Sequence, residues 1–262
     1  MSELQCIEHA LHAVAAYIQE KYRARDTLVI ATKANTTDFL TEVDIAVQKE
    51  IIGYLRSHYP NDILIAEESG LDSLGTSIPA RCWMVDPIDG TQNFLRGLFP
   101  EFGVSIGFLQ DGVPVAGGVL FPITGDVFLA EKGSGAFKNG ARMRVSTLAE
   151  PTKARIDIDF GSLDGRVPHL EKAHALLRGV GQVRSYGCSV MGFCQVADGQ
   201  QDAYIPFSVK PWDVAAGMLL VEEAGGKVTS FDGTPVSPFT AERIGVVSNN
   251  VIHAACLECL DS

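Results

Sequence analysis

The sequence predicts an α/β fold in which helices and sheets are stacked in layers. Three observations predict it. Apolar residues recur at three- and four-residue spacing near the N-terminus, short apolar runs end in acidic residues, and residues 102–137 alternate with period two between polar turns. Because no repeat, linker or low-complexity segment separates these parts, we expect a single domain over residues 1–262 with two sub-layers, roughly 1–145 and 146–262.

Two amphipathic helices are expected before the first strand. Residues 3–23 place apolar side chains on one helical face, namely Leu4, Ile7, Leu11, Val14, Ala15 and Ile18. After the polar stretch Lys33–Asp38, the segment Thr41-Glu42-Val43-Asp44 opens a second helix, whose apolar residues are Ile45, Val47, Ile51, Ile52 and Leu55. Thr41 and Asp44 have the spacing of a capping box, so Asp44 has a structural interpretation as well as the catalytic one considered below.

The elements that follow are expected in a mixed order. Ile63–Ala66 and Cys82–Val85 are short apolar runs typical of buried strands. The meander between residues 102 and 137 turns at Asp111-Gly112 and at Thr124-Gly125-Asp126. Beyond it, the patterns predict strands at 154–160, 203–205 and 227–231, and helices at 169–177, 190–197 and from Pro211 to the stop signal Gly225-Gly226.

Composition argues against several classes of protein. The formal net charge of -11 disfavours a nucleic-acid polymer or an anionic membrane as the main partner, although bound metal ions could still attract a phosphate group. No apolar run approaches the roughly 18 residues of a membrane span, and the N-terminus lacks the pattern of a signal peptide. Six cysteines in 262 residues make no disulfide framework, and Cys256-Leu257-Glu258-Cys259 lacks the second pair of a zinc site. We therefore expect a soluble, reduced, cytoplasmic protein.

The segment Asp86-Pro87-Ile88-Asp89-Gly90-Thr91 directly follows one of the predicted strands. Pro87 pushes Asp86 toward extended geometry, and Gly90 allows a sharp turn, so both carboxylates can point into one space. Hard divalent cations prefer carboxylate oxygens, and the Ile88 carbonyl could add another ligand. The plainer interpretation is an Asp-rich turn between a strand and a loop.

Acidic residues gather at the predicted ends of several elements. They are Asp44, Glu67, Glu68, Asp86, Asp89 and Asp213. Converging carboxylates repel one another by about 4 kcal/mol per close pair at an effective dielectric constant near 20, and few basic residues stand near these positions. Two or more Mg²⁺ ions would hold such a cluster together, and paired metal ions are a common device for phosphoryl transfer. Asp213 could instead serve the dipole of its helix, and Glu68 could be a solvated neighbour.

Three separated motifs resemble the inositol monophosphatase family. They are Trp83-Met84-Val85-Asp86-Pro87-Ile88-Asp89-Gly90-Thr91-Gln92-Asn93-Phe94 with Glu67-Glu68-Ser69 upstream, Trp212-Asp213-Val214-Ala215-Ala216-Gly217, and Glu223-Ala224-Gly225-Gly226. The resemblance runs from the first helix to the last strands. It implies an αβαβα sandwich, a Mg²⁺-dependent and lithium-sensitive phosphatase activity, and a homodimer.

The resemblance also implies a role for each matching metal ligand. Glu67, Asp86 and the Ile88 carbonyl would hold a first Mg²⁺, which activates the attacking water. Asp86, Asp89 and Asp213 would hold a second Mg²⁺, which stabilises the leaving oxygen. Glu67 would contribute to a weaker third site, and Mn²⁺ could substitute for Mg²⁺.

Catalytic and substrate-binding roles follow from the same resemblance. Thr91, placed by Asp44, would help to orient and deprotonate the water, and Glu67 is counted with these two as catalytic. The stretch Gly187-Cys188-Ser189 matches a Gly-Thr-Ala stretch that lies near the substrate hydroxyls in the family, and Lys33 could supply a lysine that the family often keeps near the site. The implied substrate-binding residues are Asp89, Gly90, Thr91, Gly187, Cys188, Ser189 and Asp213.

The substrate stays open at this point. Pro206 stands where inositol phosphatases of the family present a glutamate to a ring hydroxyl, so one polyol contact is missing unless Ser208 or Lys210 replaces it. Lys210 could instead meet a second anionic group, and Glu101 is another candidate for specificity. We expect a phosphomonoesterase for a small polyol or sugar phosphate, with inositol 1-phosphate as the default substrate and histidinol phosphate, fructose 1,6-bisphosphate and 3′-phosphoadenosine 5′-phosphate as alternatives. A non-catalytic regulatory binding protein is the alternative of another class, and would show degenerate ligands.

Overall fold

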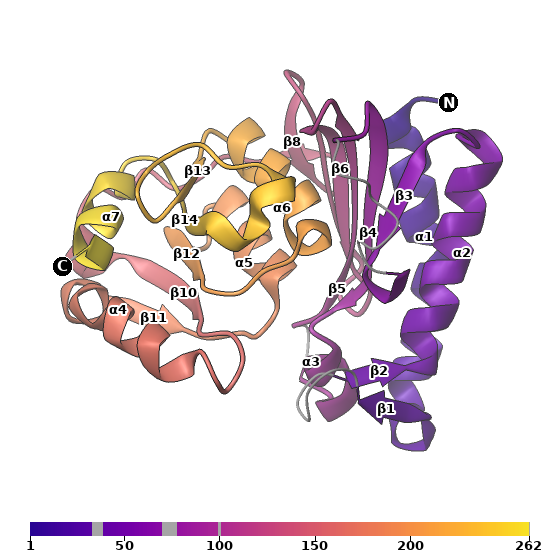
Figure 1. Cartoon of the computed structure of the whole chain (residues 1–262), viewed down its shortest axis with the longest axis horizontal. Coiled ribbons are helices and arrows are strands. Elements are labelled where there is room, and N and C mark those ends of the chain that lie inside the picture. The colour runs from indigo at the N-terminus through magenta and orange to yellow at the C-terminus, as the bar shows by residue number, and fades with distance from the viewer. Residues whose placement is uncertain (33–38, 70–77, 99–100, 262) are drawn as a thin grey trace.

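The computed structural model describes residues 1–32, 39–69, 78–98 and 101–261, and its elements form five layers (Figure 1). An outer pair of helices covers a seven-stranded sheet, and a central pair separates this sheet from a five-stranded one. A second outer pair of helices covers the far face. This order is an αβαβα sandwich, so the predicted α/β layered fold class is confirmed. Across the described residues, no helix combines the length and the apolar character of a membrane span.

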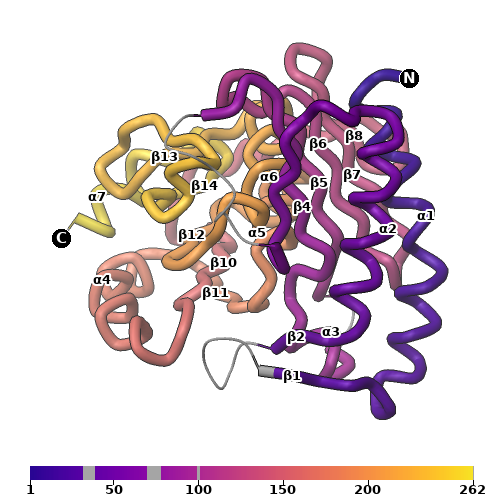
Figure 2. Tube along the Cα trace, turned by 45° about the vertical axis from the view of Figure 1, so that its right-hand side comes forward, coloured from indigo at the N-terminus to yellow at the C-terminus, as the bar shows by residue number. Residues whose placement is uncertain are grey.

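The outer N-terminal layer follows the predicted apolar pattern. It consists of α1 (Glu3–Arg23) and α2 (Glu42–His58), and α2 begins with the expected capping box between Thr41 and Asp44. The two helices pack against each other and against the seven-stranded sheet, on the opposite side from the central helices (Figure 2). Burial of this apolar face therefore holds the layer in place.

A short antiparallel hairpin lies between these helices and is not predicted from the sequence. Its strands are β1 (Ile30–Thr32) and β2 (Phe39–Thr41), too short to show a periodic pattern. The polar stretch at 33–38, with Lys33, lies outside the described residues.

The seven-stranded sheet contains the predicted meander. Its strands, in spatial order, are β3 (Ile63–Ala66), β4 (Arg81–Asp89), β5 (Gly103–Gln110), β6 (Val113–Phe121), β7 (Asp126–Glu131), β8 (Gly135–Lys138) and β9 (Ala141–Arg142). β3 and β4 are parallel, and every later pair is antiparallel. The polar turns predicted from the sequence lie between β5 and β6 and between β6 and β7.

One strand boundary differs from the prediction. The sequence predicts that the strand ends at Val85, but β4 continues to Asp89. The register with β5 runs normally as far as the pair Asp86 and Ser105 and then shifts before Asp89. Pro87 has no N–H for the ladder, so the strand passes it as an irregularity and resumes pairing beyond it.

The five-stranded sheet and its helices form the remaining layers. Its strands, in spatial order, are β11 (Gln182–Arg184), β10 (Arg155–Asp159), β12 (Ala203–Pro206), β14 (Ile244–Ser248) and β13 (Lys227–Ser230). The central helices are α5 (Ser189–Ala197) and α6 (Pro211–Glu223), the outer ones are α4 (Arg166–Gly179) and α7 (His253–Asp261), and the short α3 (Thr91–Arg96) follows β4. The sequence patterns do not predict β11, β14 and α7. Cys256 and Cys259 lie on α7 as free cysteines.

Helix α6 is attached to the seven-stranded sheet at both of its ends. At its start, the Ser105 hydroxyl donates to the Trp212 carbonyl at 3.3 Å. At its end, the Glu223 carboxylate accepts hydrogen bonds from Gly133 N at 2.7 Å and from Gly135 N at 2.8 Å. The C-terminal half of the chain is thereby joined to the sheet that carries the acidic motif.

The sheet also approaches α6 closely between these two ends. A Cβ atom at Gly107 would lie 2.6 Å from Ala215 Cβ, and one at Gly117 would lie 2.9 Å from Ala216 Cα. Glycine on the strands and alanine on the helix therefore set the separation of these two layers.

This close approach predicts opposite effects for two glycine-to-alanine substitutions. Gly107→Ala is expected to destabilise the protein by about 1–3 kcal/mol, because the new methyl group forces the layers apart. Gly53→Ala is the matched control, because Gly53 lies within α2 with no heavy atom within 4 Å of a new Cβ. It should stabilise the fold by up to about 1 kcal/mol. Urea unfolding of both variants checks the pair, and an unchanged midpoint for Gly107→Ala would contradict the packing described here.

Candidate functional site

The first two acidic residues of the site lie at the end of β4. Asp86 is buried, and its Oδ1 accepts a hydrogen bond from Ile88 N at 3.0 Å across the proline. Asp89 is partly exposed. Gly90 then adopts a φ of 85°, and a Cβ atom there would lie 2.9 Å from the Glu101 carbonyl, so this position requires glycine. The turn predicted from the sequence is therefore present, one residue beyond the end of the strand.

The third acidic residue comes from the neighbouring strand. Glu67 directly follows β3, which runs parallel to β4 with Ala66 opposite Val85, so Glu67 lies beside Asp86. The two carboxyl groups are close enough to share a hydrogen bond. Helix α2 fixes the turn that carries Glu67, because Gln48 Oε1 on this helix accepts a hydrogen bond from Glu68 N at 2.9 Å.

The fourth acidic residue begins the central helix α6. Asp213 Oδ2 accepts a hydrogen bond from Lys210 N at 2.8 Å and so caps the helix. Trp212, just before it, is buried against the seven-stranded sheet. The hydroxyl that holds the Trp212 carbonyl belongs to Ser105, which pairs with Asp86 in the sheet. Ser105 therefore links the strand that carries Asp86 to the start of the helix that carries Asp213.

A loop from the C-terminal half closes onto Asp89. This segment, residues 186–189, contains the stretch Gly187-Cys188-Ser189 predicted to contact the substrate, and its last residue, Ser189, begins α5. Asp89 Oδ2 accepts from Val190 N at 2.6 Å and from Cys188 Sγ at 3.2 Å. Asn93 Nδ2 donates to the carbonyls of Tyr186 and Glu101, both at 2.7 Å. The loop is thus tied directly to the acidic motif.

Burial and repulsion by neighbouring carboxylates raise the pKa values of the three aspartates. Burial, and then repulsion by neighbouring carboxylates with Glu67 the strongest, raises the pKa of Asp86 well above its ordinary value. Burial raises the pKa of Asp89 to about 7, although the hydrogen bond from Val190 N opposes the shift. Burial and then the charge of Asp89 raise the pKa of Asp213. Ionising the cluster is therefore unfavourable in free energy, and a bound cation would reduce this penalty.

The donor set of the site fits a hard divalent cation. All four side chains present carboxylate oxygens, and no ion pair between described residues includes Asp86, Asp89 or Asp213. Among the described residues, no three acidic side chains converge on one point as in a completed metal centre. The carboxylates are therefore neighbours that would have to close in around a cation on binding.

Thr91, Ile88 and Asp44 lie around this cluster with hydrogen bonds of their own. Thr91 Oγ1 donates to the Ile88 carbonyl at 3.0 Å, and that oxygen keeps a second lone pair for a cation. Asp44 is buried at the start of α2, where its Oδ2 accepts from Thr41 N at 2.8 Å and from Thr41 Oγ1 at 2.5 Å. The structural capping role of Asp44 is present, and its pairing with Thr91 stays a prediction.

Three positioning residues are not identified from the sequence alone. Asn93 and Ser105 act on backbone groups far along the chain, so no local pattern reveals them. Gln48 is a polar residue on the apolar face of α2, one turn after Asp44. A polar side chain at such a position indicates a buried hydrogen bond, and so the sequence does contain a signal for Gln48.

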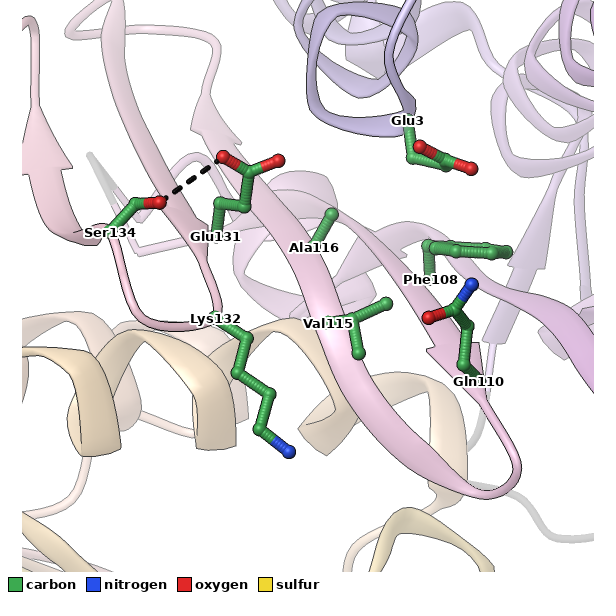
Figure 3. Close-up of a pocket in the computed structure, with 8 residues that line it drawn as sticks. All are labelled: Glu3, Phe108, Gln110, Val115, Ala116, Glu131, Lys132 and Ser134. Atoms are coloured by element: carbon green, nitrogen blue, oxygen red, sulfur yellow. Dashed lines mark hydrogen bonds between the residues drawn. The ribbon is translucent and has the colours of Figure 1, made fainter.

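The hollow drawn in Figure 3 lies away from these residues. It has a volume of about 440 Å³ and is lined by Glu3, Phe108, Gln110, Val115, Ala116, Glu131, Lys132 and Ser134. Gln110 pairs with Arg81 at the start of β4, whereas Asp89 lies at the other end of that strand. We assign this hollow no part in the chemistry.

Comparison with known proteins identifies relatives that match most of the chain. The fructose-1,6-bisphosphatase/inositol-1-monophosphatase of Thermotoga maritima is 34% identical over 225 residues, which cover 86% of this chain and 83% of that protein. The Nus factor SuhB of Pasteurella multocida is 36% identical over 219 residues, which cover 82% of this chain and 80% of that protein.

A solved structure and a family pattern agree with these relatives. The structure of an IMPase/NADP phosphatase complexed with NADP and Ca²⁺ superposes with a TM-score of 0.86 at 25% identity, covering 100% of this chain and 97% of that one. The pattern of the inositol monophosphatase family matches residues 1–261. With the fold and the three sequence motifs, these matches show that the chain belongs to the inositol monophosphatase family.

Proposed function

We propose that this chain is a Mg²⁺-dependent phosphomonoesterase that hydrolyses a small phosphate ester. The observation that carries the proposal is the gathering of Glu67, Asp86, Asp89 and Asp213 from three separate elements into one repelling cluster. Family membership supports it, because members of the inositol monophosphatase family are phosphatases. The solved relative that contains Ca²⁺ supports a metal-dependent reaction.

The proposed cation ligands are those four carboxylates and the Ile88 carbonyl, which would hold two or three ions. Bound there, Mg²⁺ would neutralise the carboxylates and stabilise negative charge on the phosphate oxygens. The chain itself prepares the ligands. Backbone N–H groups of Ile88, Val190 and Lys210 each fix one carboxylate oxygen of Asp86, Asp89 and Asp213, so the second oxygen of each aspartate has no backbone partner and could bind a cation.

Thr91 and the segment at residues 186–189, which we call the substrate loop, have proposed roles around the reacting phosphate. Because the Thr91 hydroxyl donates its hydrogen bond to the Ile88 carbonyl, its oxygen can accept a hydrogen bond from the attacking water and orient it. Asp44 is proposed to set the position of Thr91. The amides of Gly90 and Thr91 and the residues Gly187-Cys188-Ser189 are the proposed substrate contacts.

A regulatory protein is the second candidate function, and one relative favours it. The Pasteurella protein that is 36% identical to this chain is named a Nus factor. Loss of metal ligands would mark a purely regulatory role, but every acidic position of the proposed cation site is present here. The two functions are not exclusive, and titration with Mg²⁺ separates a metal-binding protein from a degenerate one. The homodimer, the lithium sensitivity and the cytoplasmic location implied by the family stay predictions.

Asp213→Asn is expected to separate stability from activity. Asparagine keeps an oxygen for Lys210 N but removes one charge from the repelling cluster, so the metal-free protein should melt at a higher temperature. Phosphate release at saturating Mg²⁺ should fall at least 100-fold, and the rise in Tm on adding Mg²⁺ should disappear. Asp261→Asn, at an exposed position at the end of the outer helix α7, is the control and should behave as wild type. Retained turnover in Asp213→Asn would contradict the ligand assignment.

Mg²⁺ affinity is expected to weaken as the pH is lowered below 7. Asp89 has a pKa of about 7 without metal, so protons compete with Mg²⁺ for this carboxylate below that pH. We expect the Kd measured by calorimetry to weaken by about tenfold for each pH unit below 7. The stability of the metal-free protein should change in the opposite direction. The folded state binds protons more tightly than the unfolded state, so Tm should rise as pH falls from 8 to 6. A Kd that is constant over this range would contradict the prediction.

The substrate class is tested with a panel of phosphate esters. Pro206 ends β12, and its side chain has no acceptor for a substrate hydroxyl, so inositol 1-phosphate should not be strongly preferred. Phosphate release is measured in parallel on inositol 1-phosphate, histidinol phosphate, fructose 1,6-bisphosphate and 3′-phosphoadenosine 5′-phosphate. A preference of 100-fold or more for the inositol ester, about 2.7 kcal/mol, would overturn the interpretation of Pro206. No release from any ester would overturn the proposed activity itself.

A further inference from the structure

Strand β10 alternates between apolar and acidic side chains, and its two faces meet different layers. Ile156 and Ile158 belong to the apolar cluster shared with the outer helices α4 and α7. Asp157 and Asp159 therefore leave the opposite face of the strand, toward the central layer. Tyr204, which pairs with Asp157 in the sheet, confirms this direction because its ring packs against Phe193 of α5. The strand thus directs two carboxylates toward the side of the sheet where the proposed active site lies.

These carboxylates border the site on the side of the substrate loop. Asp157 Oδ1 accepts from Tyr186 N at 3.3 Å, at the start of the loop that closes on Asp89. Asp159 pairs with Pro206 in the sheet and is partly exposed, and its charge raises the pKa of Asp89. A third carboxylate, Glu101, contributes to raising the pKa of Asp157 to about 7, after burial and the charge of Asp159. We call Glu101, Asp157 and Asp159 the acidic corner.

The acidic corner has little compensating positive charge. No ion pair between described residues includes Asp157 or Asp159. His169 and Arg166 lower the pKa of Asp159, but burial outweighs them and the pKa stays raised. The His169 ring is already engaged, because it stacks on Phe207 and its Nδ1 contacts the Phe160 carbonyl at 2.8 Å.

A buried hydroxyl at the base of the corner also has no partner. Tyr204 is fully buried, and its hydroxyl makes no hydrogen bond. After burial, the charges of Asp159 and Asp157 contribute most to raising its pKa, and Ser189 approaches without completing a bond. Since buried hydroxyls are almost always paired, this oxygen is available to accept a hydrogen bond from a group that binds beside it.

We propose that the acidic corner receives a positively charged amino group on the alcohol part of the substrate. An ammonium group offers three N–H donors and one positive charge, which suits carboxylates that face an unpaired hydroxyl oxygen. The proposal rests on the proposed function, because it places the phosphate at the cation site and the amino group beside Pro206. It predicts a preference for amino-alcohol phosphates over polyol phosphates and bisphosphates.

Two ester pairs test this preference in wild-type protein at saturating Mg²⁺. The first pair is 2-aminoethyl phosphate and 2-hydroxyethyl phosphate, and the second is histidinol phosphate and inositol 1-phosphate. In at least one pair, the amino ester should have a kcat/KM about tenfold higher or more, and 0.5 M NaCl should reduce that ratio. A ratio of one or below in both pairs would overturn the proposal. A preference for fructose 1,6-bisphosphate over the amino esters would also overturn it, and would favour Lys210 as a contact for a second anionic group. No hydrolysis of any ester would instead overturn the proposed function.

Asp159→Asn assigns the preference to the corner. This variant should lower the ratio of kcat/KM values for the amino and hydroxy esters about tenfold. Asp164→Asn, which removes an exposed acid in the loop after β10, is the matched control and should leave the ratio unchanged. An unchanged ratio in Asp159→Asn would overturn the role of the corner. If this variant fails to fold, Glu101→Gln replaces it, with the same expected direction and the same contradicting result.

Discussion

Repulsion among Glu67, Asp86, Asp89 and Asp213 is the constraint on which the rest of the structure depends. These acids come from the ends of two parallel strands and from the start of a central helix, and burial raises the pKa of the three aspartates. Backbone N–H groups hold one oxygen of each aspartate, so the three aspartates are already neighbours before a cation draws them together. This repulsion destabilises the fold at one place, and such local destabilisation is common at functional sites.

The layered architecture brings these acids together from distant parts of the chain. Asp86 and Asp89 belong to the seven-stranded sheet, and Asp213 arrives on α6, which lies between the two sheets. Asp89 also anchors the start of α5 through Val190 N and the segment before it through Cys188 Sγ. A single aspartate therefore links the proposed cation site to the proposed substrate loop, so metal occupancy and loop position are coupled through one side chain.

The sequence predicts much of this arrangement, and the gaps have physical causes. The apolar periodicity gives α1, α2, the meander and α6, and the motif spacing identifies Asp86, Asp89 and Asp213. The extent of β4 was underestimated because Pro87 suggests a break, whereas the strand resumes pairing beyond it. The sequence does not assign a role to Asn93, since one of its partners is the Tyr186 carbonyl, 93 residues along the chain. The alternation in β10 is visible in the sequence, but which face meets the site depends on how the layers stack.

The attachment of α6 at both ends restricts the number of residues it can contain. Trp212 and Glu223 must each meet fixed groups on the same sheet. Inserting or deleting one residue between them would turn one end of the helix by about 100° and shift it by about 1.5 Å relative to the other. One of the two attachments would then be lost, and with it the position of Asp213 or of the loop at Gly133. Natural variation in chain length is therefore expected in the surface loops, while this helix keeps a constant length.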